Sequence, residues 1–209
     1  QGIDRRDGRP LNPMVNAGAI ITVSLTAATT PEARWERIHG IFDEFAGERL
    51  PLREAVYESV SGSNSRNRAV ANRLEYNQRL GAAPLETLDA YNRQSCLAIT
   101  AKQLARMGAV LANGGVDPAT GKRIVDTDTV EAVLSVMMTS GFYNESGRWA
   151  FDAGLPAKSG VGGGIVAIVP GEMAIVAFSP RLSEAGNSVR GTGAIRHISD
   201  ALDLSVFRP

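Results

Sequence analysis

The chain has 209 residues, of which 44% are hydrophobic and 21% are charged, a composition typical of a globular protein long enough to bury a core. Its 22 basic and 22 acidic residues balance and form no long run of one sign. This pattern argues against a nucleic-acid-binding surface or a polybasic membrane anchor. The apolar stretches are too short to span a bilayer, so no membrane partner is expected.

The cysteine and histidine content bears on disulfides, on the cellular compartment and on metal binding. Cys96 is the only cysteine, which excludes an internal disulfide and favours a reducing compartment, so we expect a cytoplasmic protein. Neither His39 nor His197 lies at a spacing typical of metal ligands, and no metal is expected. The chain begins with Gln1 instead of methionine, followed by a polar turn at Asp4–Gly8. We therefore expect a trimmed product that lacks an N-terminal part.

Four helices are predicted in the first half of the chain. Residues 16–25 are small and apolar without a period of two, which indicates a buried helix. At residues 30–32 a threonine hydroxyl, a proline and an acid follow one another, which is a good helix start, and this helix should end near Gly47. Helical patterns also cover residues 66–80 and 85–91.

Two further helices are predicted in the middle of the chain. Thr100 and Gln103 have the spacing of a capping box, and the glycines after Asn113 should end the helix that follows. Another helix is expected to begin at Asp128 and to run to about Met138.

The pattern then changes to short strands. Ile165–Val169 and Met173–Phe178 are rich in β-branched residues, and the turn residues Pro170–Glu172 between them predict a hairpin. A last helix is expected over residues 188–204. Because helices and strands are segregated along the chain, we expect an α+β fold and not an alternating parallel sheet.

The segment 155–164 carries the strongest single indication of chemistry. Lys158-Ser159-Gly160 resembles the Lys-Thr-Gly element that walls one side of the active site in penicillin-recognising serine hydrolases. In the functional interpretation, the backbone N–H near Val161 stabilises an oxyanion and Lys158 adds positive potential. The alternative is a glycine-rich turn before an ordinary strand. The glycine spacing fits neither a P-loop nor a dinucleotide-binding motif.

The attacking group of such a site is not found in the chain. Penicillin-recognising enzymes use a Ser-x-x-Lys nucleophile, and no serine here has a lysine three residues later. The nearest case is Ser65, which is followed by Arg68. The sequence thus contains the receiving half of an acyl-transfer site without the attacking half.

Four polar side chains have two open interpretations. Asn16 and Asn67 each stand at the start of a predicted helix, where an asparagine either caps the helix or projects into a pocket and holds a polar ligand. Tyr91 and Tyr143 either pack at the edge of the core with wet hydroxyls or contribute to that pocket. The cysteine and both histidines are interpreted as structural.

Taken in order, six motifs between Arg9 and Phe207 resemble those of the serine-dependent glutaminases. They are Asn12-Pro-Met-Val-Asn-Ala-Gly-Ala-Ile20, Val56-Tyr-x-Ser59 with Arg66-Asn-Arg-Ala69, Tyr91-Asn-Arg-Gln-Ser-Cys96, Leu111-Ala-Asn-Gly-Gly115, Ser140-Gly-Phe-Tyr143 and Gly154-Leu-Pro-Ala-Lys-Ser-Gly-Val161. The resemblance implies one domain over residues 1–209 with a fold like those of β-lactamases and penicillin-binding proteins: a helical block, antiparallel strands and a C-terminal helix. It also implies hydrolysis of L-glutamine to L-glutamate and ammonia.

The resemblance implies a role for five residues. Asn16, Asn67 and Tyr91 would bind the amino-acid head of glutamine. Tyr143 would carry protons beside the nucleophile, and the backbone N–H of Val161 would belong to the oxyanion hole. The reaction would pass through a γ-glutamyl ester on serine without a cofactor, in a homodimer or homotetramer.

Two departures from the family pattern leave alternatives open. The Ser-x-x-Lys pair of the family belongs upstream of Arg9. The family also has a glutamate seven residues before Asn67, where it meets the substrate's α-ammonium, and here that position is Val60, with Glu58 two residues earlier. Burying an ammonium without a partner carries a desolvation penalty of several kcal/mol. The alternatives are a catalytically inactive glutaminase-like binding protein and an amidohydrolase for substrates without a free α-ammonium.

Overall fold

The computed structural model describes residues 2–4 and 6–208, and these form two compact units. The first comprises the residues up to 44 together with 48–98, and the second comprises 45–47 and the residues from 99 onward. Within the described part of the chain, none of the helices combines the length and the apolar character needed to cross a membrane. The α+β class predicted from the sequence is confirmed.

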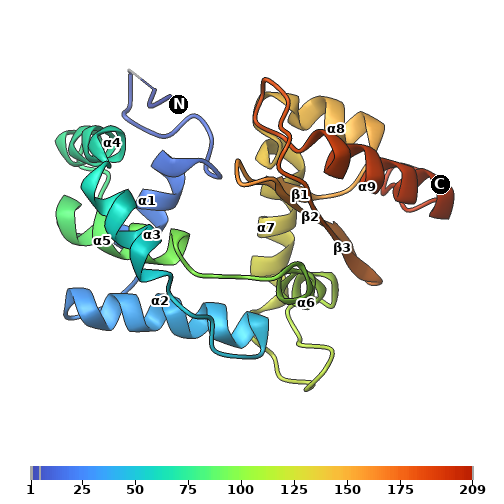
Figure 1. The fold of residues 1–209 in the computed structure, drawn as a ribbon, viewed down its shortest axis with the longest axis horizontal. Helices are drawn as coiled ribbons and strands as arrows, with labels where there is room; N and C mark the ends of the chain where they lie inside the picture. The colour runs from blue at the N-terminus through green and yellow to red at the C-terminus, as the bar shows by residue number, and fades with distance from the viewer. Residues whose placement is uncertain (1, 5, 209) are drawn as a thin grey trace. The chain divides into compact units, whose positions relative to one another are not determined.

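The first unit is helical (Figure 1). Its helices are α1 (Asn16–Leu25), α2 (Pro31–Ala46), α3 (Glu54–Gly62), α4 (Ser65–Tyr76) and α5 (Pro84–Ser95). Helix α1 contacts both α4 and α5, and its small apolar residues let Ile20 become fully buried beside Ala71 and Leu74. A second cluster joins Val23, Ile38 and Ala90. The buried helix predicted at residues 16–25 is therefore confirmed.

The helices of this unit differ from the predictions in three places. Helix α5 continues to Ser95, four residues past the predicted end at Tyr91. Helix α4 ends at Tyr76 and not at residue 80, because Gln78 takes a left-handed φ of 56° and the N–H of Arg79 turns back to the carbonyl of Leu74 at 2.9 Å. Helix α3 was not predicted. None of its nine residues is buried, and its apolar residues Val56, Tyr57 and Val60 cover little more than one turn, which is too short to establish a period.

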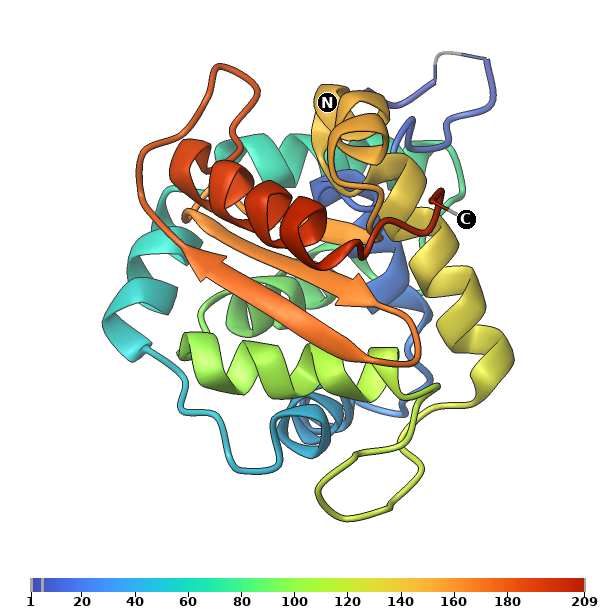
Figure 2. The same ribbon diagram turned by 90° about the vertical axis from the view of Figure 1, so that its right-hand side faces the viewer.

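The second unit packs helices on a small sheet. Its elements are α6 (Ala101–Ala112), α7 (Thr127–Ser140), the 3₁₀ turn η1 (Tyr143–Glu145), α8 (Ser146–Asp152), β1 (Ala157–Ser159), β2 (Gly164–Val169), β3 (Met173–Phe178) and α9 (Val189–Leu202). The strands are antiparallel in the order β1-β2-β3, which confirms the predicted hairpin. Figure 2 shows α9 lying across one face of this sheet.

Strand β2 is covered on both faces. Ile165 and Ala167 join Ile195 of α9 in the main core of the unit. On the other face, a Cβ added to Gly108 of α6 would lie 3.0 Å from Val166. Two-sided burial explains why this strand reads as a continuous apolar run instead of an alternating one.

The helix starts in this unit test the capping predictions. The capping box is confirmed: the N–H of Gln103 donates to Oγ1 of Thr100 at 3.2 Å, and the N–H of Thr100 donates to Oε1 of Gln103 at 2.7 Å. The start predicted at Asp128 is wrong by two residues. Asp126 caps α7 by accepting from the N–H of Thr129 at 2.8 Å, and Asp128 lies in the first turn. Helix α8 was missed because seven residues are too few to show a period.

The close approach of α6 to the sheet yields a prediction. A Cβ at Gly108 would stand 2.6 Å from Cβ of Ala174, whereas a Cβ at Gly40 of α2 meets nothing within 4 Å. We expect Gly108→Ala to lower the free energy of unfolding by about 1–2 kcal/mol through overpacking. The matched variant Gly40→Ala should raise it by about 0.5–1 kcal/mol through helix propensity. Urea denaturation measures both, and equal effects would contradict the packing described.

Candidate active site

The turn between α7 and α8 holds Tyr143 in a strained conformation. Its φ of 53° is left-handed, which costs a residue with a side chain roughly 1–2 kcal/mol. Oγ of Ser146 accepts from the N–H of Phe142 at 3.0 Å and donates to the carbonyl of Tyr143 at 2.9 Å. Phe142 is buried and stacks on Trp149 with ring centroids 4.1 Å apart. Packing and hydrogen bonds therefore maintain the strain, as is common at functional sites.

The structure brings Tyr143, Val161 and Lys158 together. The backbone N–H of Val161 lies close enough to the Tyr143 hydroxyl to favour the ionised phenol. Nζ of Lys158 lies 4.6 Å from the centroid of the Tyr143 ring and donates to the carbonyl of Ser159. The two residues expected to act on the reacting groups are thus in contact, with a cation beside them.

Burial changes the ionisation of this cluster. It raises the pKa of the Tyr143 phenol, and the nearby N–H of Val161 opposes that rise in pKa. It also lowers the pKa of Lys158 to about 8, so that the ammonium remains mostly charged at neutral pH. At that pH the cluster therefore contains a neutral phenol next to a positive charge.

A glycine-rich turn presents the main chain of Val161. The N–H of Gly160 donates to the carbonyl of Gly164 at 2.9 Å, and the N–H of Gly163 donates to the carbonyl of Gly160 at 2.9 Å. Gly163 has a φ of 97°, which a residue with a side chain rarely adopts. Val161 is 71% exposed, and the role predicted for it belongs to its backbone N–H.

A buried asparagine connects the turn that carries Tyr143 to the strand of the Lys-Ser-Gly segment. Oδ1 of Asn187 accepts from Oγ of Ser159 at 2.6 Å. Its Nδ2 donates to the carbonyl of Phe142 at 3.3 Å and to Oε2 of Glu145 at 2.5 Å. Sequence analysis missed Asn187 and Glu145. The Gly186-Asn187-Ser188 run signals only a helix start, and Ser188 provides that cap, which leaves the Asn187 amide to face inward.

In the first unit, Asn16 and Asn67 are hydrogen-bonded to each other. Nδ2 of Asn16 donates to Oδ1 of Asn67 at 2.9 Å, across 51 residues of sequence. The helix-cap interpretation is wrong for both, because the N-cap residues of α1 and α4 are Val15 and Asn64. The pair keeps one amide oxygen as an acceptor and one NH₂ group as a donor, which suits an α-ammonium and a carboxylate.

The other predicted positions in the first unit are described by their burial and by the helices that carry them. Tyr91 of α5 is half-buried and packs against both apolar clusters. Val60 is half-buried and Glu58 is exposed, and both lie on α3. Two residues along a helix are rotated by about 200°, so Glu58 faces away from the side that Val60 occupies.

Of the three residues interpreted as structural, His39 and Cys96 are buried, whereas His197 is exposed on α9. His39 is buried, with Nε2 2.8 Å from the Leu50 carbonyl and its ring stacked on Trp35. Burial raises the pKa of the Cys96 thiol, which makes it a poor nucleophile. Among the residues that the structure describes, no group of three or more histidine, cysteine and acidic side chains is arranged to hold a metal ion.

The five predicted site residues thus form two groups. Asn16, Asn67 and Tyr91 belong to the first unit, and Tyr143 and Val161 belong to the second. Contacts join the asparagines to each other and Tyr143 to Val161. That all five line one cavity stays a prediction.

The pKa of Lys158 gives a test by stability. Between about 8 and 10.5, the unfolded chain holds a proton that the folded chain has released, so the free energy of unfolding should rise with pH. Because Lys158→Met removes this group, the rise in the free energy of unfolding over this pH range should be about 1–3 kcal/mol smaller in the variant than in the wild type. Urea denaturation at pH 7.5 and 10.5 measures the difference. The exposed Lys102→Met variant should keep the wild-type dependence, and an unchanged profile in Lys158→Met would contradict the burial of this ammonium.

Comparison with known proteins identifies the family. The glutaminase family model matches residues 2–207. A glutaminase from Colwellia psychrerythraea is 47% identical over 206 residues, which cover 98% of this chain and 66% of the relative. One from Mycobacterium ulcerans is 46% identical over 205 residues, 98% of this chain and 64% of the relative. The chain thus spans slightly less than two thirds of the length of these relatives.

Solved structures agree. A probable glutaminase is 46% identical with a TM-score of 0.94, covering 97% of this chain and 66% of that one. A Bacillus subtilis glutaminase in covalent complex with 5-oxo-L-norleucine is 33% identical with a TM-score of 0.91, covering 95% of this chain and 70% of that one. These likenesses confirm the β-lactamase-like fold expected from the motifs. The chain belongs to the glutaminase family.

Proposed function

We propose that the protein hydrolyses L-glutamine to L-glutamate and ammonia through a γ-glutamyl ester on a serine. That serine would come from a Ser-x-x-Lys segment that residues 1–209 do not contain. The contact between the Val161 N–H and the Tyr143 hydroxyl, beside Lys158, is the observation that carries the proposal. The covalent 5-oxo-L-norleucine complex of the Bacillus subtilis glutaminase supports a covalent intermediate.

In the acylation step, the serine oxygen would attack the carbon of the side-chain amide. The negative charge that develops on the amide oxygen would be stabilised by the Val161 N–H, a main-chain donor fixed by the glycine turn. Tyr143 would give its proton to the departing nitrogen and take the serine proton in return. The C–N bond breaks, ammonia leaves, and the acyl group remains on serine.

Water would then reverse this sequence. It attacks the ester carbonyl, Tyr143 passes the water proton to the serine oxygen, and glutamate is released. A phenol whose pKa is raised by burial is protonated at neutral pH, which suits this relay better than the role of a permanently charged base. The positive charge of Lys158 would stabilise the transient phenolate.

The amino-acid head would be held by Asn16 and Asn67. Their mutual hydrogen bond orients one amide oxygen for the α-ammonium and one amide NH₂ for the α-carboxylate. Tyr91 would add its hydroxyl. Val60, at the expected glutamate position, would weaken the hold on the ammonium, and it favours a second candidate function, hydrolysis of amides that lack the amino group.

The oligomeric state and the cellular location of the enzyme are proposed by analogy with the family. A homodimer or homotetramer in the cytoplasm would fit the family resemblance and a single buried thiol. Sedimentation equilibrium of the purified protein would establish the assembly.

Replacing the phenol tests the proton relay. In a protein that contains the serine, Tyr143→Phe should lower kcat for glutamine by about 10²–10⁴-fold while changing KM less than about threefold. Tyr76, a tyrosine 78% exposed on α4, provides the control Tyr76→Phe, which should leave both constants unchanged. An unaltered kcat in Tyr143→Phe would remove this residue from the mechanism.

Restoring the carboxylate tests the substrate class. Val60→Glu should lower KM for glutamine about tenfold through a charge-assisted contact with the ammonium. It should not improve hydrolysis of glutaramic acid, the analogue without an amino group. Val56→Glu places the same charge at an exposed position of α3 and should have no effect. Wild-type preference for glutaramic acid would favour the second candidate function.

A further inference from the structure

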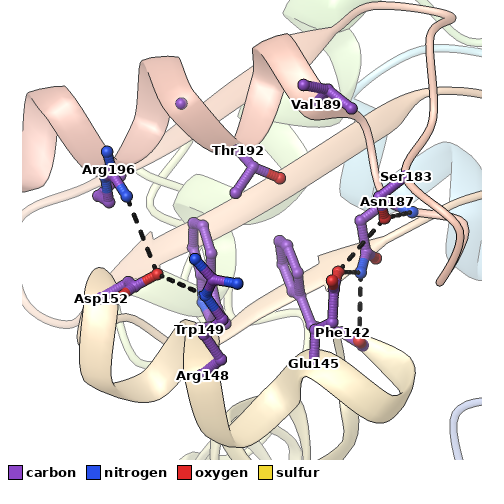
Figure 3. A pocket seen from close by; sticks show the side chains of 11 residues that line it. Phe142, Glu145, Arg148, Trp149, Asp152, Ser183, Asn187, Val189, Thr192 and Arg196 are labelled. Carbon is purple, nitrogen blue, oxygen red and sulfur yellow. Dashed lines mark hydrogen bonds and ion pairs between the residues drawn. The ribbon is translucent and has the colours of Figure 1, made fainter.

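A cavity of about 330 Å³ is lined by Phe142 and Glu145, which lie on either side of Tyr143 in the sequence (Figure 3). It is bounded by α8, by α9 and by the loop at residues 183–187, all within the second unit. The proposed glutamine chemistry assigns no role to it. Its volume suits a small molecule of the size of a single aromatic ring or amino acid.

One end of the cavity carries excess positive charge. Nε of Arg148 lies 3.2 Å from Oδ2 of Asp152, and NH1 of Arg196 lies 3.9 Å from the same oxygen. Figure 3 shows both guanidiniums converging on that carboxylate. Two guanidiniums share one acid, so most of their N–H donors remain available to a ligand. A carboxylate is the group that such donors bind best.

The middle of the cavity is apolar. Phe142 and Trp149 lie there, stacked face to face with ring centroids 4.1 Å apart, and contribute apolar ring atoms to the lining. Thr192 of α9 also lines the cavity, but its hydroxyl oxygen is itself buried and lies out of reach of a ligand. A small apolar body would fit beside these groups.

The far end of the cavity disfavours a second carboxylate on the ligand. The carboxylate of Glu145 lines the cavity there and accepts from Nδ2 of Asn187 at 2.5 Å and from Oγ of Ser183 at 3.4 Å. A dicarboxylate reaching this end would meet a negative charge. The cavity therefore favours a monocarboxylate.

The walls of the cavity are also parts of the candidate active site. Phe142 precedes Tyr143, and Glu145 follows it by two residues. Asn187 connects the same turn to Ser159 of β1. A ligand that displaces Glu145 or Phe142 would act on the strained conformation of Tyr143.

We propose that this cavity is a second small-molecule site, which binds a monocarboxylate with a small apolar body and changes the position of the Tyr143 turn when occupied. The regulatory part rests on the proposed glutaminase function. The binding part does not.

The binding part is tested by ligand-observed NMR with benzoate as the probe and the full-length protein as the receptor. Benzoate should bind saturably, and neutral benzamide should bind at least about tenfold more weakly because it loses the charge-assisted hydrogen bonds. Arg196→Gln should weaken benzoate binding and leave benzamide binding unchanged. Equal binding of benzoate and benzamide, or no binding of benzoate, would overturn the proposal.

A pocket-filling variant tests the location. Gly193 of α9 lines the cavity, and a Cβ there meets nothing within 4 Å, so Gly193→Leu should fold and occupy the space. It should abolish benzoate binding. Gly40→Leu, a helical glycine with equally open surroundings in the first unit, should retain it. Benzoate binding that survives in Gly193→Leu would show that the ligand lies elsewhere.

The regulatory part is tested with the same variants by glutamine turnover. Benzoate should change kcat in the wild type and in Gly40→Leu but not in Gly193→Leu. Binding without a change in kcat would overturn the coupling and leave the site. Absence of any glutamine turnover in the unliganded wild type would instead contradict the proposed function, while the NMR result would still decide the site.

Discussion

The hydrogen bonds of one buried amide hold the candidate site together. Asn187 is 2% exposed, and its side chain contacts Ser159 on β1 and both Phe142 and Glu145 on the turn that carries Tyr143. In a buried location each of these polar groups would be costly to leave unpaired, so the three segments must keep one arrangement. Asn187 thereby connects the turn that carries Tyr143 to the strand that precedes the Val161 turn.

The surrounding fold supports this arrangement by close packing. Glycine at position 108 lets α6 approach one face of the sheet, and α9 covers the other face through Ile195. Strand β2 is therefore fixed from both sides, and β1 is fixed by its register with β2. These contacts hold the three-residue strand that carries Lys158 in place.

Much of this architecture could be predicted because the signals were local. The apolar run of α1, the capping box at Thr100 and the turn chemistry of the β2–β3 hairpin each specify their element within a few residues. Helices α3 and α8 escaped prediction because both are too short to establish a period. Asp126 was overlooked as a cap because Asp128, two residues later, offered the same chemistry.

The candidate site residues were named from local motifs, and their joint role stays a prediction. Order and identity of motifs indicated Asn16, Asn67, Tyr143 and Val161, whereas the contacts between them depend on tertiary structure. The 51-residue separation of the asparagine pair leaves no local signal. Likewise, Asn187 looks like a helix cap in the sequence, and only the position of Ser188 shows that its amide faces inward.

The central claim is that the Val161 N–H donates a hydrogen bond to the amide oxygen of the substrate, next to the Tyr143 hydroxyl. The most direct measurement is the Val161 amide ¹H–¹⁵N signal in the serine-containing protein before and after reaction with 6-diazo-5-oxo-L-norleucine. The account predicts a single covalent adduct and a large downfield shift of this amide, because it then donates to a carbonyl oxygen. Covalent labelling that leaves the Val161 signal unmoved would contradict the account.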